Sequence, residues 1–167
     1  AIEPDGQTGT LTGTYVASDA IRREVLALRR TGKPVVASMA NVAASGGYYI
    51  AMPADAIVAQ PSTLTGSIGI FGGKFVMAGA YEKLGANIES TSIGRHAEMN
   101  SPERPFNESE RAKLMEQMQA FYDDFVEKAA QSRKTTPERI DNLAQGRVWT
   151  GRQAREQGLV DELGGLD

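Results

Sequence analysis

Hydrophobic positions near the start of the chain recur at helical spacing and then give way to an unbroken apolar run. The helical spacing is carried by Ile21, Val25 and Leu28, with charged residues between them. Such spacing is typical of an amphipathic helix, which we expect to begin at an N-cap, Ser18, and to end at Gly32. The run over residues 34–40 is short and rich in β-branched residues, which predicts a buried parallel strand.

The rest of the chain alternates between these two patterns. Helices are expected over residues 43–52, 76–84, 107–132, from 136 onward and over 150–158. Strands are expected over 56–59, within 63–70, over 86–92 and at 159–160. Residues 1–14 and 92–106 are rich in turn formers, so the chain is expected to start irregularly and to carry an exposed loop. This alternation predicts an α/β fold, and 167 residues are enough for a single domain, 1–167.

Composition and charge exclude several functions. Hydrophobic residues make up 41% and charged residues 23% of the chain, as in an ordinary globular domain. The net charge of −3 provides no basic surface, so we expect no nucleic-acid partner. The absence of cysteine and the single histidine, His96, argue against a metal site, and we expect neither a metal nor an organic cofactor. No apolar run approaches the ~18 residues of a membrane span.

The densest group of small residues, 43–47 (AASGG), falls between a predicted strand and a predicted helix. A serine at such a turn is presented at a helix N-terminus, where free amides stabilise negative charge. Ser45 is therefore a candidate nucleophile, and the amide of Gly46 is a candidate oxyanion donor. The alternative is that the small residues only allow a helix to pack closely on a sheet. The spacing matches neither of the glycine-rich phosphate-binding signatures.

Three motifs in order carry a family resemblance. Residues 33–73, the segment GRVWTGRQAR at 146–155 and the segment GLVDELG at 158–164 resemble the signal peptide peptidase A (protease IV) family. The resemblance extends over about residues 15–167. It implies a Clp protease/crotonase-like core, a superhelix of ββα units. It also implies a serine endopeptidase that degrades cleaved signal peptides and other hydrophobic peptides and forms homo-oligomers. Such an enzyme would act at the inner membrane, on its extracytoplasmic (periplasmic) side.

The resemblance also assigns roles to individual residues. It implies that Ser45 is the nucleophile, that the Gly46 amide contributes to the oxyanion hole and that Ser67 holds a general-base lysine in place. A lysine buried beside a serine can accept a proton near neutral pH because desolvation lowers its pKa. Tyr48, Ile70 and Phe71 are expected to line a groove for apolar substrate residues.

The general-base lysine itself is missing from its family position. Short family members carry it where this chain has Ser92. In double-length members the N-terminal unit supplies the lysine and the C-terminal unit the serine, so this chain resembles the C-terminal half. Its partner would be the N-terminal, lysine-bearing unit of the same protein. The six lysines of the chain are expected to be solvated charges. Lys33, at the entrance of a predicted strand, and Lys74, beside a second glycine cluster, are the alternative bases within the chain.

Two other functions remain open at this point. A crotonase-like acyl-CoA enzyme would use an oxyanion hole without a serine nucleophile. A non-catalytic assembly domain would keep the fold and lack a working site, which the missing lysine favours for this chain in isolation.

Overall fold

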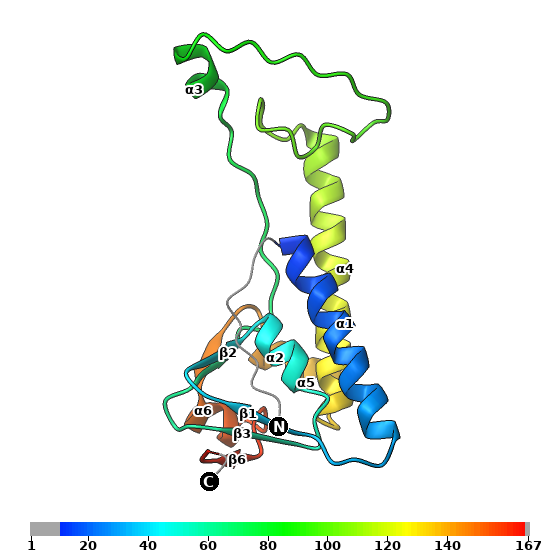
Figure 1. Ribbon diagram of the computed structural model, residues 1–167, viewed down its shortest axis with the longest axis vertical. Coiled ribbons are helices and arrows are strands. Elements are labelled where there is room, and N and C mark those ends of the chain that lie inside the picture. Colours follow the sequence, from blue (N-terminus) through cyan, green and yellow to red (C-terminus); the bar gives the residue numbers. More distant parts are fainter. Residues whose placement is uncertain (1–10, 166–167) are drawn as a thin grey trace. The chain divides into compact units, whose positions relative to one another are not determined.

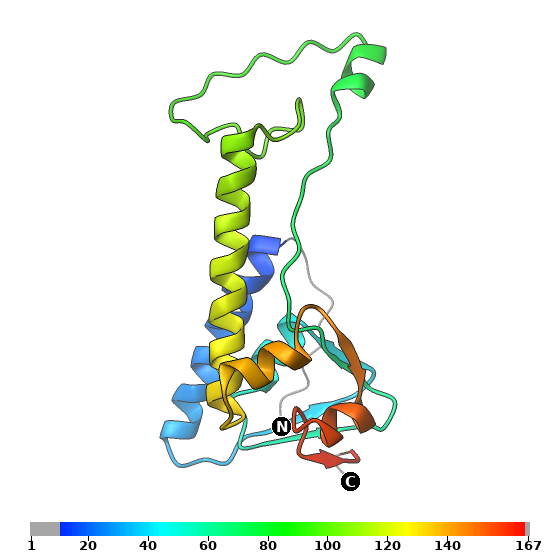
Figure 2. The ribbon, with the colours of Figure 1, turned by 180° about the vertical axis from the view of Figure 1, so that it is seen from behind.

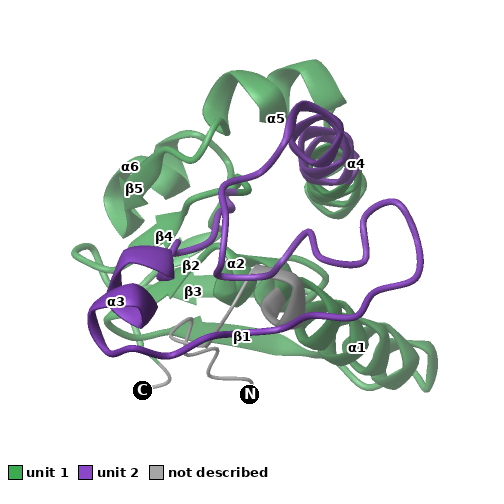
Figure 3. Cartoon of the chain, turned by 90° about the horizontal axis from the view of Figure 1, so that it is seen from above, with its two compact units in different colours: residues 1–70, 121–167 green, residues 71–120 purple. Residues whose placement is uncertain are grey.

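The computed structural model describes residues 11–165, with side chains from Tyr15 onward, and the chain forms two compact units (Figure 3). The first unit contains the described residues up to Ile70 and those from Phe121 onward. The second unit is the intervening segment, 71–120. The prediction of a single domain over 1–167 stays a prediction.

The first unit is built on two successive pairs of short strands. They are β1 (Val36–Met39), β2 (Val42–Ala44), β3 (Ala56–Ala59) and β4 (Leu64–Gly66), with helix α2 (Gly46–Ala51) between the pairs. β1 pairs in parallel with β3, and β2 pairs in parallel with β4. Each pair thus contributes its first strand to one sheet and its second strand to another (Figure 1). Stacking of equivalent ββ segments in this way is the arrangement expected from the ββα superhelix.

The C-terminal segment completes both sheets (Figure 2). Helix α5 (Pro137–Leu143) leads to β5 (Val148–Thr150), which pairs antiparallel with β4. Helix α6 (Gly151–Glu156) then leads to β6 (Glu162–Leu163), which pairs in parallel with β3. The two sheets therefore have the strand orders β1-β3-β6 and β2-β4-β5.

Two long helices complete the described elements of the first unit. Helix α1 is Leu11–Arg30, and helix α4 is Glu108–Ser132, whose residues from Phe121 onward belong to this unit. The core contains buried side chains of α2 and of strands β1 and β3, together with others from α4, α5 and α6. Its largest fully buried members include Tyr48, Tyr49, Met39, Met52 and Ile57.

The second unit contains helix α3 (Ala78–Lys83) and the first turns of α4. A capping box starts α4: the Glu110 amide donates to the Asn107 side chain at 2.8 Å, and the Asn107 amide donates to the Glu110 carboxylate at 3.0 Å. Arg104 donates to both oxygens of the same carboxylate at 2.7 Å. This helix start agrees with the helix expected over residues 107–132.

The structure confirms the predicted α/β class, strands β1 and β3 and helices α3 to α6. Four expectations were wrong in detail. Helix α1 begins at Leu11 rather than Ser18, because Tyr15 packs its ring on the buried ring of Tyr49 and on the ring of Phe121. Ala43 and Ala44 belong to strand β2 rather than to the next helix, since β4 pairs with them.

The other two corrections concern strands. Residues 86–92 form no strand; they are exposed, and the described chain offers them no paired strand. The C-terminal strand forms at Glu162–Leu163 rather than at 159–160, because Leu159 and Val160 are buried in the core just before it. Strand β5 was not predicted.

Candidate active site

Ser45 is the single residue between strand β2 and helix α2. Its backbone has φ 52° and ψ −113°, a conformation that a residue with a side chain adopts only under strain. The Ser45 amide donates to the Gly66 carbonyl at 2.9 Å, and its own carbonyl accepts the Tyr49 amide at 2.9 Å. Ser45 is half-buried and its hydroxyl does not cap the helix. The structure confirms that Ser45 occupies a sharp strand-to-helix turn.

Ser67 occupies the equivalent position on the neighbouring strand. The last paired residues of β2 and β4 are Ala44 and Gly66, so Ser45 and Ser67 leave adjacent strands at the same level. Ser67 also has a positive φ, 48°, and its amide donates to the Arg147 carbonyl at 2.8 Å. Within residues 11–165 neither serine hydroxyl has a hydrogen-bond partner. The structure therefore brings the two predicted serines to one edge of one sheet.

Strand β5 pairs with β4 and contacts its last residue, Gly66, directly before Ser67. A Cβ atom on Gly66 would lie 2.7 Å from Cδ1 of Trp149, so only glycine fits against the indole. The indole nitrogen donates to the Leu143 carbonyl at 2.9 Å, which fixes the ring. A Cβ atom on Gly69 would lie 2.8 Å from the backbone of Gly146. The GRVWT segment thus supports the serine-bearing turn.

The lysines of the first unit differ in their exposure to solvent and in their bonding partners. Lys33 and Lys134 are exposed, whereas Lys128 is half-buried and bonded to Asp19, Asp124 and Tyr49. The expectation that Lys128 is a surface charge was wrong, because α1 packs over its face of α4. Burial lowers its pKa, but the hydrogen bonds to Asp124 and Asp19 outweigh this, and the pKa of Lys128 is raised. A lysine in this state does not serve as a general base.

The lysines of the second unit have local partners or lie on its helices. Lys74 donates to the Met99 carbonyl at 2.9 Å and lies 4.4 Å from the centre of the Phe106 ring. Lys113 pairs with Glu116, and Lys83 lies in the last turn of α3. Ser92, at the family position of the lysine, is exposed.

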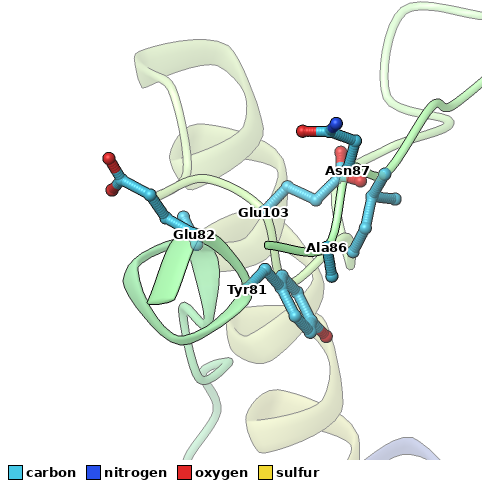
Figure 4. A pocket seen from close by; sticks show the side chains of 7 residues that line it. Tyr81, Glu82, Ala86, Asn87 and Glu103 are labelled. Atoms are coloured by element: carbon cyan, nitrogen blue, oxygen red, sulfur yellow. The ribbon is translucent and has the colours of Figure 1, made fainter. Parts of the chain in front are cut away.

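The three predicted groove residues fall into different environments. Tyr48 has no exposed surface, and its hydroxyl donates to the Leu159 carbonyl at 3.1 Å, so its side chain belongs to the core. Ile70 is half-buried, and Phe71 is 82% exposed. The second unit has a hollow of about 320 Å³ beside α3, lined by Tyr81, Asn87 and Glu103 among others (Figure 4). None of the predicted site residues lines it.

The cluster around Lys128 was not predicted from the sequence. Its members on α4, Asp124 and Lys128, are spaced i,i+4, which is the spacing of an ordinary exposed ion pair. The signal that could have found it is the adjacent tyrosine pair, Tyr48-Tyr49, in a segment otherwise made of small residues. Among the described residues, no group of acidic or histidine side chains could hold a metal, and no helix is long and apolar enough to cross a membrane.

Comparison with known proteins gives concordant results. The chain is 48% identical over 155 residues to a chloroplastic serine protease, SPPA, of Arabidopsis thaliana, covering 92% of this chain and 23% of that protein. It is 44% identical over 155 residues to Protease 4 of Salmonella typhi, covering 93% of this chain and 25% of that protein. The chain therefore spans about a quarter of the length of these relatives.

A solved structure supports the fold independently. A ClpP1 mutant from Listeria monocytogenes matches with a TM-score of 0.56, covering 98% of this chain and 72% of that chain at 15% identity. The chain thus has a Clp-like fold. The profile of Peptidase family S49 matches residues 27–167, which include both serines and the supporting strand β5. On this match, and on the identity with its relatives, the chain belongs to Peptidase family S49.

Proposed function

We propose that this chain carries the nucleophile of a serine peptidase whose general base is a lysine of another unit. The Ser45 hydroxyl attacks the carbonyl carbon of the scissile amide, and its proton passes to the lysine. The Gly46 amide donates to the oxyanion. The lysine returns the proton to the leaving amine, and water then hydrolyses the acyl-serine.

The observation that carries this proposal is the backbone of Ser45. Ser45 has a positive φ and lies between a strand and a helix, which is the kind of turn at which α/β-hydrolases carry their nucleophile. Strain of this kind persists only where the surrounding structure imposes it, here through the bonds to Gly66 and Tyr49. Membership of Peptidase family S49 makes peptide-bond hydrolysis the appropriate chemistry.

The source of the base follows from the lysines of the first unit. Lys128 is held by two carboxylates, and Lys33 and Lys134 have exposed side chains. A serine peptidase of the serine–lysine type instead needs a lysine whose pKa is lowered by burial. We place this lysine in an N-terminal unit of the same protein and assign to the free Ser67 hydroxyl the role of orienting it.

The substrates follow from the family. Extended hydrophobic peptides, among them cleaved signal peptides, would bind beside the edge of the sheet that carries both serines. The relatives include a protein named Protease 4. We further propose that the complete protein forms homo-oligomers and acts at the inner membrane, on its extracytoplasmic side.

The test uses the complete protein with a fluorogenic apolar peptide and a serine-directed fluorophosphonate. Ser45→Ala should lower kcat by about 10⁴-fold or more and abolish labelling. Ser62→Ala, which removes an exposed serine from the turn before β4, is the control and should leave both unchanged. Full activity of Ser45→Ala contradicts the proposal. A wild-type protein that is never labelled supports an acyl-CoA enzyme or an assembly domain instead.

A further inference from the structure

A half-buried group of polar side chains joins three helices of the first unit. The Lys128 cluster consists of Asp19 on α1, Tyr49 on α2, and Asp124 and Lys128 on α4. Tyr15 on α1 adds a hydrogen bond from its hydroxyl to Asp124. Three helices that are far apart in the sequence therefore meet at one ammonium group.

The geometry of the cluster satisfies every donor of that ammonium. Lys128 Nζ lies 2.9 Å from Asp19 Oδ1, 2.7 Å from Asp124 Oδ2 and 2.7 Å from the Tyr49 hydroxyl. A lysine has three donors, so none is left for another partner. The Tyr49 hydroxyl lies 3.1 Å from Asp19 and 3.2 Å from Asp124 and donates its one proton to one of them. The arrangement fixes the position of the phenol oxygen from three directions.

Tyr49 connects the cluster directly to the candidate nucleophile. Its amide donates to the Ser45 carbonyl at 2.9 Å, which is the first hydrogen bond of the short helix α2. Its ring is 1% exposed and packs edge-on against Tyr15 and Phe125, with centroid distances of 5.6 and 4.9 Å. A rotation or shift of Tyr49 therefore moves the carbonyl of Ser45.

Helix α2 has a second anchor on the adjacent residue. The Tyr48 hydroxyl donates to the Leu159 carbonyl in the core. Tyr48 thus ties α2 to the C-terminal segment, and Tyr49 ties it to α1 and α4. With both anchors in place, a helix of six residues cannot turn about its own axis without breaking one of them.

We propose that Lys128 is a positioning residue, which holds Tyr49 and through it sets the orientation of helix α2 and of Ser45. Lys128 does not take a proton from the nucleophile. Its raised pKa keeps it charged at neutral pH, which the two carboxylates require. The inference rests on the proposed function, because it assumes that Ser45 is the nucleophile.

The experiment compares variants of the complete protein by kcat, KM, melting temperature and the rate of fluorophosphonate labelling. Lys128→Met keeps the length of the side chain and removes all three donors, whereas Lys128→Arg restores the charge and the pairing with carboxylates. Tyr49→Phe removes only the hydroxyl and keeps the ring. A change of about 1 Å in the position of a nucleophile can cost about 100-fold in rate. We therefore expect Lys128→Met and Tyr49→Phe to lower kcat and the labelling rate by about 10- to 100-fold at unchanged KM.

Two matched controls lie on the same helix, α4. Lys113→Met breaks the pair between Lys113 and Glu116, and Tyr122→Phe removes the hydroxyl that donates to Asp141. Neither residue contacts the cluster, so both variants should keep wild-type kcat even where they lower the melting temperature. Lys128→Arg should recover most of the kcat lost in Lys128→Met.

The outcomes separate this inference from the proposed function. If Ser45→Ala is inactive but Lys128→Met and Tyr49→Phe keep wild-type kcat, the inference fails and the proposed function stands. A fall in melting temperature with no change in kcat or labelling also overturns it, since the cluster is then purely structural. If Ser45→Ala is active, both fail. Should Lys128→Met not fold, Tyr49→Phe decides by the same criteria.

Discussion

The amide of Ser45, the residue after β2, donates to the carbonyl of Gly66, the last paired residue of β4, at 2.9 Å. The bond continues the ladder of the parallel strands by one step and then stops, because Ser45 turns away with a positive φ. Gly66 has a positive φ of 74° as well. The two turns therefore depend on each other, and a change at Gly66 should reach Ser45.

Replacing Gly66 tests this dependence. In Gly66→Ala the added Cβ would lie 2.7 Å from the Trp149 ring and would also be strained by the positive φ. We expect the conformational cost of ~1–2 kcal/mol together with an overpacking cost of ~1–3 kcal/mol. Urea unfolding measures the loss. Gly32→Ala is the control, because Gly32 has a φ of 81° and open space around it, so it should show the conformational cost alone. Equal losses in the two variants would mean that Trp149 yields without cost.

Removing the Ser67 hydroxyl should affect catalysis without affecting stability. Within the described chain this hydroxyl has no partner, so Ser67→Ala should change the free energy of unfolding by less than ~0.5 kcal/mol. In the complete protein we expect kcat to fall by about tenfold or more, because a base that is not oriented accepts a proton poorly. Peptide hydrolysis and urea unfolding on the same samples check both halves. An unchanged kcat would show that Ser67 does not orient the base.

The ion pair between Arg133 and Asp161 should contribute more to the free energy of unfolding than the pair between Arg155 and Glu162. Asp161 bonds the Arg133 guanidinium at 2.5 Å and accepts the Ile57 amide at 2.7 Å, and Arg133 is only 11% exposed. Asp161→Asn should cost ~1–3 kcal/mol because a charged hydrogen-bond partner is lost. Glu162→Gln breaks an exposed pair with Arg155 at 3.4 Å and should cost under ~0.5 kcal/mol. Thermal unfolding of both variants gives the comparison, which similar losses would contradict.

Acidification should weaken the start of helix α4 at a predictable pH. The hydrogen bonds from Arg104 and from the Asn107 amide lower the pKa of Glu110 from 4.5 to about 2. A carboxylate whose pKa is lower in the folded state contributes stability above its unfolded pKa and loses it as pH falls toward the folded value. The stability difference between the wild type and Glu110→Gln should therefore be constant near neutral pH and shrink between pH 4.5 and about 2.

Urea unfolding at a series of pH values measures this difference. Glu108→Gln is the matched control, since Glu108 is an exposed carboxylate in the same turn of the helix. The free energy of unfolding of this variant shows what the loss of an exposed carboxylate in this turn does by itself. A Glu110→Gln difference that is independent of pH would show that the bonds to Arg104 and Asn107 do not favour the charged form.

Local sequence signals predicted those features that depend on neighbouring residues. The helix starts at Asn107, Thr136 and Thr150 follow from side-chain caps within the same turn, and the structure has all three. The turn at Ser45 was predicted because small residues there separate a strand from a helix. Residues 86–92 have a strand-like composition, but a strand also needs a partner, which local composition does not reveal.

The features that were missed depend on contacts distant in the sequence. Lys128 and Asp19 are 109 residues apart, so each has the pattern of a solvated charge until α1 and α4 pack together. Strand β5 has only three residues, so its local pattern does not predict a strand. It forms because it pairs with β4, where the indole of Trp149 lies against Gly66. The contact of the GRVWT segment with the turn at Gly66 therefore could not be predicted from the sequence.

The long separations within the first unit have a consequence for synthesis on the ribosome. The anchors of α2 join Tyr49 to Lys128, 79 residues later, and Tyr48 to Leu159, 111 residues later. Translation adds about 5–20 residues per second, so Ser45 leaves the ribosome seconds before the residues that orient it exist. The strand-to-helix turn at Ser45 thus acquires both of its anchors only after Leu159 has been synthesised.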